Sequence, residues 1–158
     1  MENLKELVQN LTEKGKTISS MESCTGGGFT NAITNIEGAS EVLKFSAVTY
    51  SNEFNIKMGV SKEIIDKYTV YSNETARAMS KTISDYTNSD YGVGITGKLN
   101  RIDKNNLFGE DNIVYFSIYD RKNDKYFDND LKVVEVSRSE NKKLVIESIT
   151  HKLLELLK

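Results

Sequence analysis

Helical and strand-like patterns alternate along most of this chain, and two strand patterns follow one another directly only near its end. Helices are predicted over about 2–14, 26–35, 62–67 and 140–157, with one more that ends at about 58 and another that begins at 72–74. Strands are predicted over about 16–21, 45–50, 91–96, 113–119 and 126–136. Alternating helices and strands pack as helices on both faces of a sheet, and a late hairpin adds antiparallel strands. The pattern therefore predicts a three-layer α/β domain with a mixed sheet.

Serines mark the starts of two of the predicted helices. Ser61 and Ser72 can each cap a helix by accepting a backbone N–H group. The helix that begins near Ser72 has apolar residues at helical spacing, so one stripe of it is expected to be buried. That stripe consists of Ala76, Met79, Ile83 and Tyr86.

Length and composition favour a single globular domain over residues 1–158. The chain has 158 residues, of which 38% are hydrophobic and 28% are charged, and it shows no repeat or linker. A formal charge of −2 gives no support for nucleic-acid binding, which needs a basic surface. No apolar run reaches the ~18 residues of a membrane span, and the N-terminus lacks the apolar core of a signal peptide. We therefore expect a cytoplasmic protein.

The chain has one cysteine, Cys24, and one histidine, His151, and this restricts its chemistry. An intramolecular disulfide and a cysteine-based zinc site are excluded, and a Ser-His-Asp triad is not favoured. His151 lies within the last predicted helix, far from every motif, and is expected to be a surface residue. Cys24 is interpreted as a small buried residue, although a thiol at a helix start can become acidic. No metal and no cofactor are predicted.

The segment Glu22 to Gly28, ESCTGGG, joins a predicted strand to a predicted helix. Its three glycines allow a ligand to approach the backbone, and the first N–H groups of a helix attract an anion. The alternative is a strand-to-helix turn in which Ser23 or Thr25 caps the helix. The residues themselves leave both interpretations open.

Three further places carry candidate polar side chains. Ser40 follows Gly38 by two residues and is either a hydroxyl exposed at the end of the sheet or a helix cap. Thr96 ends a buried strand in GITG, where ligands often bind in open α/β sheets, or it satisfies its own hydrogen bonds there. Arg138 stands between the last strand and the last helix, where a solvated surface charge is the usual interpretation.

Together, ESCTGG, the G-x-S segment, VTYSNE ten residues further on and a strand ending in TG resemble the CinA carboxyl-terminal domain family. This family includes the nicotinamide-nucleotide amidases. The resemblance extends from about Leu4 to Leu157. It implies a three-layer α/β/α domain with a five-stranded mixed sheet, assembled as a homodimer. It also implies hydrolysis of the carboxamide of nicotinamide mononucleotide to nicotinic acid mononucleotide and ammonia, without a cofactor.

The resemblance assigns roles to residues at matching motif positions. Ser40 corresponds to the family nucleophile, and Tyr50 and Thr96 correspond to the family tyrosine and threonine. Lys57 is the candidate proton acceptor, because a lysine can serve this purpose for a serine. Arg138 corresponds to the family arginine and can bind the 5′-phosphate. The predicted pocket is shaped by further residues of the two glycine-containing turns: Glu22, Ser23, Thr25, Gly26 and Gly97.

Two departures from the family pattern favour a second hypothesis. Asn55 stands where the family has a lysine, and Lys57 lies two positions further on. The family's small, proline-containing loop after the threonine is replaced here by a segment with Lys98 and Arg101, which predicts a more cationic wall. The alternative function is a weakened or inactive homologue that binds a nucleotide or a protein partner. A third hypothesis is an amidase for another small amide.

Overall fold

The computed structural model describes residues 2–100, 110–134 and 137–158. Its helices are α1 (Glu2–Lys14), α2 (Gly28–Thr34), α3 (Asn52–Met58), α4 (Lys62–Tyr68), α5 (Asn73–Thr87) and α6 (Arg138–Leu156), with a 3-10 turn η1 (Ala39–Glu41). Its strands are β1 (Ile18–Glu22), β2 (Ala47–Val48), β3 (Tyr91–Gly97), β4 (Ile113–Asp120) and β5 (Lys125–Lys132). The predicted order of helices and strands is confirmed.

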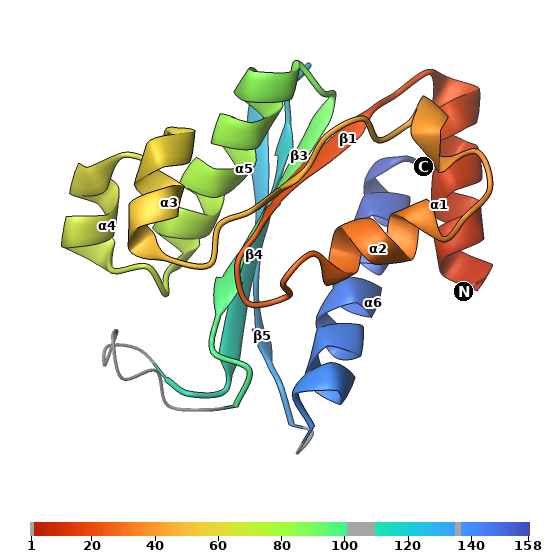
Figure 1. Cartoon of the computed structure of the whole chain (residues 1–158). Helices are drawn as coiled ribbons and strands as arrows, with labels where there is room; N and C mark the ends of the chain where they lie inside the picture. The colour runs from red at the N-terminus through yellow and green to blue at the C-terminus, as the bar shows by residue number, and fades with distance from the viewer. Residues whose placement is uncertain (1, 101–109, 135–136) are drawn as a thin grey trace.

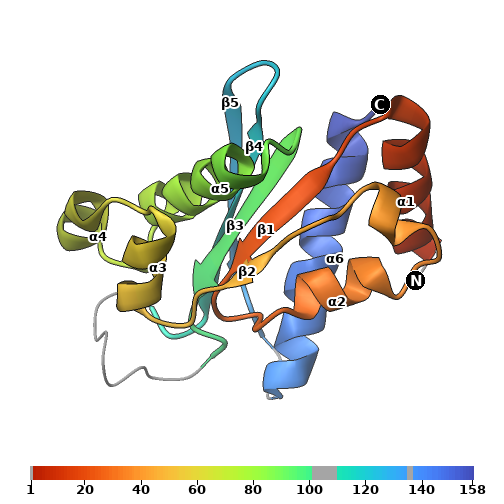
Figure 2. The same cartoon turned by 45° about the horizontal axis from the view of Figure 1, so that its top comes forward.

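The five strands form one mixed sheet in the order β2-β1-β3-β4-β5. Strands β2, β1 and β3 are parallel, whereas β4 runs antiparallel to β3 and β5 antiparallel to β4. Helices α1, α2 and α6 cover one face of the sheet and α3, α4 and α5 cover the other (Figures 1 and 2). The predicted three-layer α/β/α domain with a five-stranded mixed sheet is therefore confirmed. The parallel strands β1, β2 and β3 end at the same edge, which is called the carboxyl edge below.

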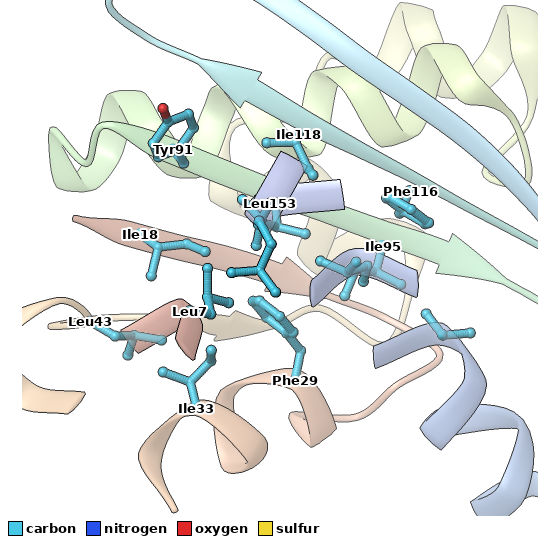
Figure 3. Packing of buried hydrophobic residues seen from close by; sticks show 14 of the residues in the cluster. Leu7, Ile18, Phe29, Ile33, Leu43, Tyr91, Ile95, Phe116, Ile118 and Leu153 are labelled. Atoms are coloured by element: carbon cyan, nitrogen blue, oxygen red, sulfur yellow. The ribbon is translucent and has the colours of Figure 1, made fainter. Parts of the chain in front are cut away.

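A hydrophobic core lies on each face of the sheet. The larger core joins α1, α2 and α6 to the sheet, and its side chains Phe29, Phe116 and Leu153 are fully buried (Figure 3). The smaller core lies under α5 and includes Met79 and Ile83. No helix in the described ranges, 2–100, 110–134 and 137–158, has both the length and the apolar character needed to cross a membrane.

Helix α5 packs unusually close to β3 because two positions of β3 that face it are glycines. A Cβ atom on Gly92 or Gly94 would overlap the backbone of α5, at Ser80 and Ala76 respectively. The start of α5 has the predicted cap, since Ser72 Oγ accepts the Thr75 N–H at 3.1 Å. This close contact fixes α5, and with it the loop that precedes it, against the end of β3.

Four details of the prediction are wrong. Ser61 stands at the N-terminal cap position of α4, but its side chain makes no capping hydrogen bond. The strand predicted over 126–136 ends at Lys132, and residues 135 and 136 lie outside the described residues.

The other two details concern Tyr86 and the second predicted strand. Tyr86 is not part of the buried stripe of α5; its side chain is 66% exposed and its ring packs on Phe45, with ring centroids 5.4 Å apart. The strand predicted over 45–50 is reduced to Ala47–Val48. The cause lies at Ser46, whose Oγ accepts the Ser20 N–H at 3.1 Å in place of a backbone carbonyl.

The substitution Gly94→Ala tests the close packing of α5 on β3. Its methyl group would lie 2.6 Å from the Ser80 nitrogen, where only backbone movement can relieve the overlap. We expect a loss of about 1–3 kcal/mol in the free energy of unfolding, measured by urea denaturation. The control is Gly28→Ala, whose methyl group would meet the flexible Ile146 side chain at 3.3 Å. Equal stability of the two variants would contradict this account of the packing.

Candidate functional site

The carboxylate of Glu22 organises the turn at the end of β1. It is fully buried, and its Oε1 accepts the Thr25 hydroxyl at 2.6 Å and the Phe29 N–H at 3.0 Å. Its Oε2 accepts three hydrogen bonds, from the Thr30 N–H at 2.9 Å, from the Thr30 hydroxyl at 2.6 Å and from the Ser20 hydroxyl at 3.3 Å. A carboxylate has about four lone-pair sites, so five donors leave none for a ligand.

These bonds correct one part of each interpretation of the ESCTGGG turn. The residue at the N-terminal cap position of α2 is Gly27, without a side-chain bond, so neither Ser23 nor Thr25 caps the helix as expected. The Phe29 and Thr30 N–H groups, which were candidates for binding an external anion, bind the Glu22 carboxylate instead. Glu22 and Thr25 therefore shape the turn from inside, and contact between substrate and either side chain stays a prediction.

Tyr50 and Arg138, 88 residues apart, meet at the carboxyl edge. Arg138 Nη2 donates a hydrogen bond to Tyr50 Oη at 3.2 Å. Each residue is placed by the start of a helix: Tyr50 directly precedes Ser51, which caps α3, and Arg138 follows Ser137, which caps α6. Tyr50 is 64% exposed, so its ring is open to a ligand. The structure thus brings these two residues together, and their roles toward a substrate stay a prediction.

A second cation, Lys142, lies on α6 one turn after Arg138. A Cβ atom built on Gly26 would lie 3.5 Å from Lys142 Nζ, so this ammonium group faces the glycine turn. The sequence interpretation missed Lys142, although its spacing of four residues from Arg138 puts both on one helix face. The two cations and the turn form a positively charged surface beside Tyr50.

Cys24 is buried in the turn between these charges. Burial raises the pKa of its thiol to about 12, and the charge of Arg138 offsets only part of this effect. The thiol is therefore protonated at neutral pH and is not an activated nucleophile. This confirms the interpretation of Cys24 as a buried packing residue.

Thr96, Ser23 and Gly97 lie at the ends of β1 and β3. Thr96 is fully buried, and its hydroxyl donates to the Val70 carbonyl oxygen at 2.9 Å, before α5. Ser23 is half-buried, and its N–H donates to the Ile95 carbonyl oxygen at 3.0 Å. Gly97 has no room for a side chain, because a Cβ atom there would lie 2.6 Å from Val114 Cα. Thr96 thus binds the neighbouring loop in this structure, and its contact with substrate stays a prediction.

Ser40 does not lie with Tyr50 and Arg138 in the single chain. It is exposed in η1, and two residues later Val42 accepts a hydrogen bond from the N–H of Ile18, the first residue of β1. Tyr50 lies beyond the other end of β1, since Val48 is in register with Glu22. The five residues of β1 make four steps of ~3.3 Å, so its two ends lie ~13 Å apart. Ser40 and Tyr50 therefore do not meet within the chain, and the catalytic role of Ser40 stays a prediction.

Lys57 also points away from the site. Its Nζ lies 3.1 Å from Glu53 Oε2 and its side chain is 60% exposed. Asn55, at the position where the family has a lysine, is fully buried, and its Oδ1 accepts the Thr49 hydroxyl at 2.6 Å. Asn55 therefore holds α3 against the end of β2, and neither residue is placed to accept a proton from Ser40.

The loop after β3 begins with a buried lysine. Lys98 Nζ lies 3.5 Å from Asp111 Oδ1 and 5.0 Å from the centre of the Tyr71 ring. The predicted cationic wall thus has Lys98 turned inward, and Arg101 lies outside the described residues. Within the parts of the chain that the structure describes, no cluster of three or more histidine, cysteine or acidic side chains is arranged to hold a metal ion.

A cavity of about 440 Å³ lies elsewhere, between α4, α5 and Tyr126 of β5. None of the predicted site residues lines it. Its cations Arg77 and Lys81 are paired with Asp128 and Asp85. These paired charges distinguish the cavity from the surface around Arg138.

The fold defines a three-layer α/β/α domain whose candidate site lies where parallel strands end, a usual place for ligand sites in such sheets. The sequence model of the CinA C-terminal domain matches residues 2–158, and the chain belongs to this family. It is 44% identical over 98 residues to a CinA-like protein of Kosmotoga olearia, a match that covers 61% of this chain and 24% of the relative. A putative competence-damage inducible protein of Clostridium kluyveri is 43% identical over 88 residues, covering 55% of this chain and 22% of that protein.

Solved structures confirm the fold. A competence or damage-inducible protein from Enterobacter asburiae superposes with a TM-score of 0.88 at 23% identity, covering 99% of this chain and 97% of the other. A competence/damage inducible protein from Agrobacterium tumefaciens gives 0.84 at 24% identity, covering 99% and 96%. By contrast, the match to the curated relatives from Kosmotoga and Clostridium spans only about a quarter of their length.

The substitution Glu22→Gln tests the structural role of the buried carboxylate. Glutamine replaces one acceptor oxygen with an NH₂ group that would face hydroxyl and N–H donors. We expect the free energy of unfolding to fall by about 1–3 kcal/mol, measured by urea denaturation at neutral pH. The exposed Glu37→Gln is the control and should change stability little. A Glu22→Gln protein as stable as this control would contradict the proposed organisation of the turn.

Proposed function

We propose that this chain binds nicotinamide mononucleotide at the Tyr50–Arg138 surface and hydrolyses its carboxamide to the carboxylate and ammonia. The observation that carries the proposal is the 3.2 Å contact between the Arg138 guanidinium and the Tyr50 phenol at the carboxyl edge. Membership of the CinA family, which includes amidases of this type, supports the same substrate class.

The charges of the site suit the phosphate of the nucleotide. A guanidinium group binds phosphate through two parallel hydrogen bonds, and Arg138 lies at the start of α6, where the helix dipole also favours an anion. Lys142 adds a point charge on the same helix face. The glycine turn lets a ligand approach this pair closely, because Gly26 carries no side chain between the turn and Lys142.

The exposed ring of Tyr50 suits the other end of the nucleotide. A pyridinium ring carries a positive charge, and the face of a tyrosine ring attracts cations. The hydrogen bond from Arg138 fixes the phenol oxygen and so orients the ring. Phosphate and pyridinium would therefore be held by adjacent groups of one surface.

In the proposed reaction a serine hydroxyl oxygen adds to the carboxamide carbon. A proton acceptor takes the hydroxyl proton and passes it to the departing ammonia. The C–N bond breaks, and water then hydrolyses the acyl ester to give the carboxylate and restore the hydroxyl. Ser40 is the serine that the family resemblance assigns to this step. Preorganised donors near the carbonyl oxygen would stabilise the intermediate.

A second candidate function is nucleotide binding without turnover. It is favoured by two observations: Asn55 is buried and bonded to Thr49, and Lys57 is paired with Glu53 in solvent. A serine without a proton acceptor reacts slowly, since general-base assistance contributes ~10²–10⁴-fold. Ammonia release from nicotinamide mononucleotide separates the two functions. Release that Ser40→Ala abolishes supports the amidase, and saturable binding without release from folded protein supports the binder.

The substitution Arg138→Met tests the phosphate contact. We expect it to weaken binding of nicotinamide mononucleotide about 10-fold or more, because it removes a charge-assisted bidentate contact. Binding of nicotinamide riboside, which lacks the phosphate, should be almost unaffected. Isothermal titration calorimetry measures both affinities.

The matched control for this prediction is Arg121→Met. It removes the same charge from a residue that pairs with Asp85 at 2.7 Å, away from the site. Nucleotide affinity should then stay at the level of the unmodified protein. Equal losses in the two variants, or an Arg138→Met protein that binds normally, would reject the assignment of the phosphate to Arg138.

A further inference from the structure

The cavity between α4 and α5 lies apart from the Tyr50–Arg138 surface and has its own chemistry. Its volume of about 440 Å³ falls within the ~300–1,000 Å³ range of small-molecule sites. Helices α4 and α5 lie side by side on the face of the sheet that also carries α3 (Figures 1 and 2). Tyr126 contributes to the wall from β5, so three elements of the fold hold the cavity in shape.

The guanidinium group of Arg77 is held beside the cavity with one of its edges free. Its Nε donates a hydrogen bond to Asp128 Oδ2, and its Cζ lies 5.4 Å from the centre of the Tyr126 ring. Asp128 is itself fixed, because its Oδ1 accepts the Ser117 hydroxyl at 2.7 Å. Within the part of the chain that the structure describes, Arg77 Nη1 and Nη2 have no hydrogen-bond partner. Such a pair of nitrogens can bind a carboxylate through two parallel hydrogen bonds.

Glu74 supplies a negative charge one turn before Arg77 on α5. Both residues line the cavity, and their spacing of three residues puts them on one face of the helix. Arg77 nevertheless pairs with Asp128 and not with Glu74. Over residues 2–100, 110–134 and 137–158, Glu74 takes part in no ion pair. A ligand in the cavity would therefore find one free cationic edge and one free carboxylate.

The other two charges that line the cavity are already neutralised. Lys81 Nζ lies 2.8 Å from Asp85 Oδ2, and Asp85 Oδ1 accepts a hydrogen bond from Arg121 at 2.7 Å. Neither Lys81 nor Asp85 is therefore available as the main partner of a ligand. A phosphate dianion would meet the uncompensated Glu74 carboxylate, and like charges oppose binding. The cavity thus suits a ligand that carries one positive and one negative charge, and not the phosphate of a nucleotide.

Much of the remaining wall is apolar or aromatic. Ile64 and Ala78 contribute aliphatic surface, and Tyr68 and Tyr126 contribute aromatic rings. The side chain of Tyr68 is 40% exposed, so its ring is open to a ligand. Aromatic rings pack favourably against one another in edge-to-face or offset geometry. The cavity therefore has room for an aromatic group close to its two free charges.

We propose that this cavity is a second binding site, which takes a free amino acid with an aromatic side chain. The carboxylate of the ligand binds Arg77, its ammonium group binds Glu74, and its ring packs against Tyr68 and Tyr126. None of the residues predicted for the amidase site lines this cavity. The inference is therefore independent of the proposed function.

The first experiment titrates the unmodified chain with L-phenylalanine and L-tryptophan by isothermal titration calorimetry. We expect saturable binding of one molecule per chain. Phenethylamine lacks the carboxylate, 3-phenylpropionate lacks the ammonium group and L-alanine lacks the ring, so each should bind about 10-fold more weakly or worse. No binding of either aromatic amino acid with a Kd below ~1 mM overturns the proposal. Equal binding of L-phenylalanine and its analogues does the same.

The second experiment locates the site with charge substitutions. Arg77→Met and Glu74→Gln should each weaken L-phenylalanine binding about 10-fold or more, because each removes a charged partner of the ligand. Arg138→Met is the matched control, since it makes the same substitution on the other surface, and it should bind L-phenylalanine like the unmodified chain. Equal losses in Arg77→Met and Arg138→Met, or normal binding by Arg77→Met, overturn the assignment to this cavity.

The third experiment fills the cavity without changing any charge. Ala78→Leu adds a branched side chain to the wall and should abolish L-phenylalanine binding while Arg77 keeps its bond to Asp128. Thermal denaturation checks that the variant is folded. A folded Ala78→Leu protein that binds L-phenylalanine normally overturns the proposal. All three experiments measure amino-acid binding, so a failure of the proposed amidase activity does not alter their results.

Discussion

The buried carboxylate of Glu22 is the interaction on which the candidate site depends. Its five hydrogen bonds join the end of β1 to the first turn of α2 and hold the glycine turn in place. An isolated buried charge would be very costly, but here every acceptor position is filled and the start of a helix adds its dipole. The turn therefore presents Gly26 toward the cations of α6.

This arrangement divides the ESCTGGG segment into two functions. The side chains of Glu22, Cys24 and Thr25 are buried and serve the structure. The backbone at Gly26 forms one wall beside Lys142. A motif that looks like an anion-binding turn thus contains its own anion, and the positive charge available to a ligand comes from α6.

Sequence patterns predicted the elements well because they depend on local spacing. The alternation of helices and strands, the Ser72 cap and the fold class needed only short-range rules. The predictions that failed depend on contacts between distant segments. Tyr86 has the spacing of a buried residue but lies at the end of α5, on Phe45. Residue spacing also does not predict that Ser46 replaces a backbone acceptor or that Lys98 points inward.

The site was predictable only in part for the same reason. Motif positions indicated Tyr50 and Arg138, and these residues do meet. They also indicated Ser40, but spacing along the chain carries no information on which end of β1 a residue occupies. A crystal structure with bound nicotinamide mononucleotide tests the account most directly. It should place the phosphate on the Arg138 guanidinium and the pyridinium against Tyr50. A nucleotide bound in the cavity beside Tyr126, or away from Arg138, would contradict it.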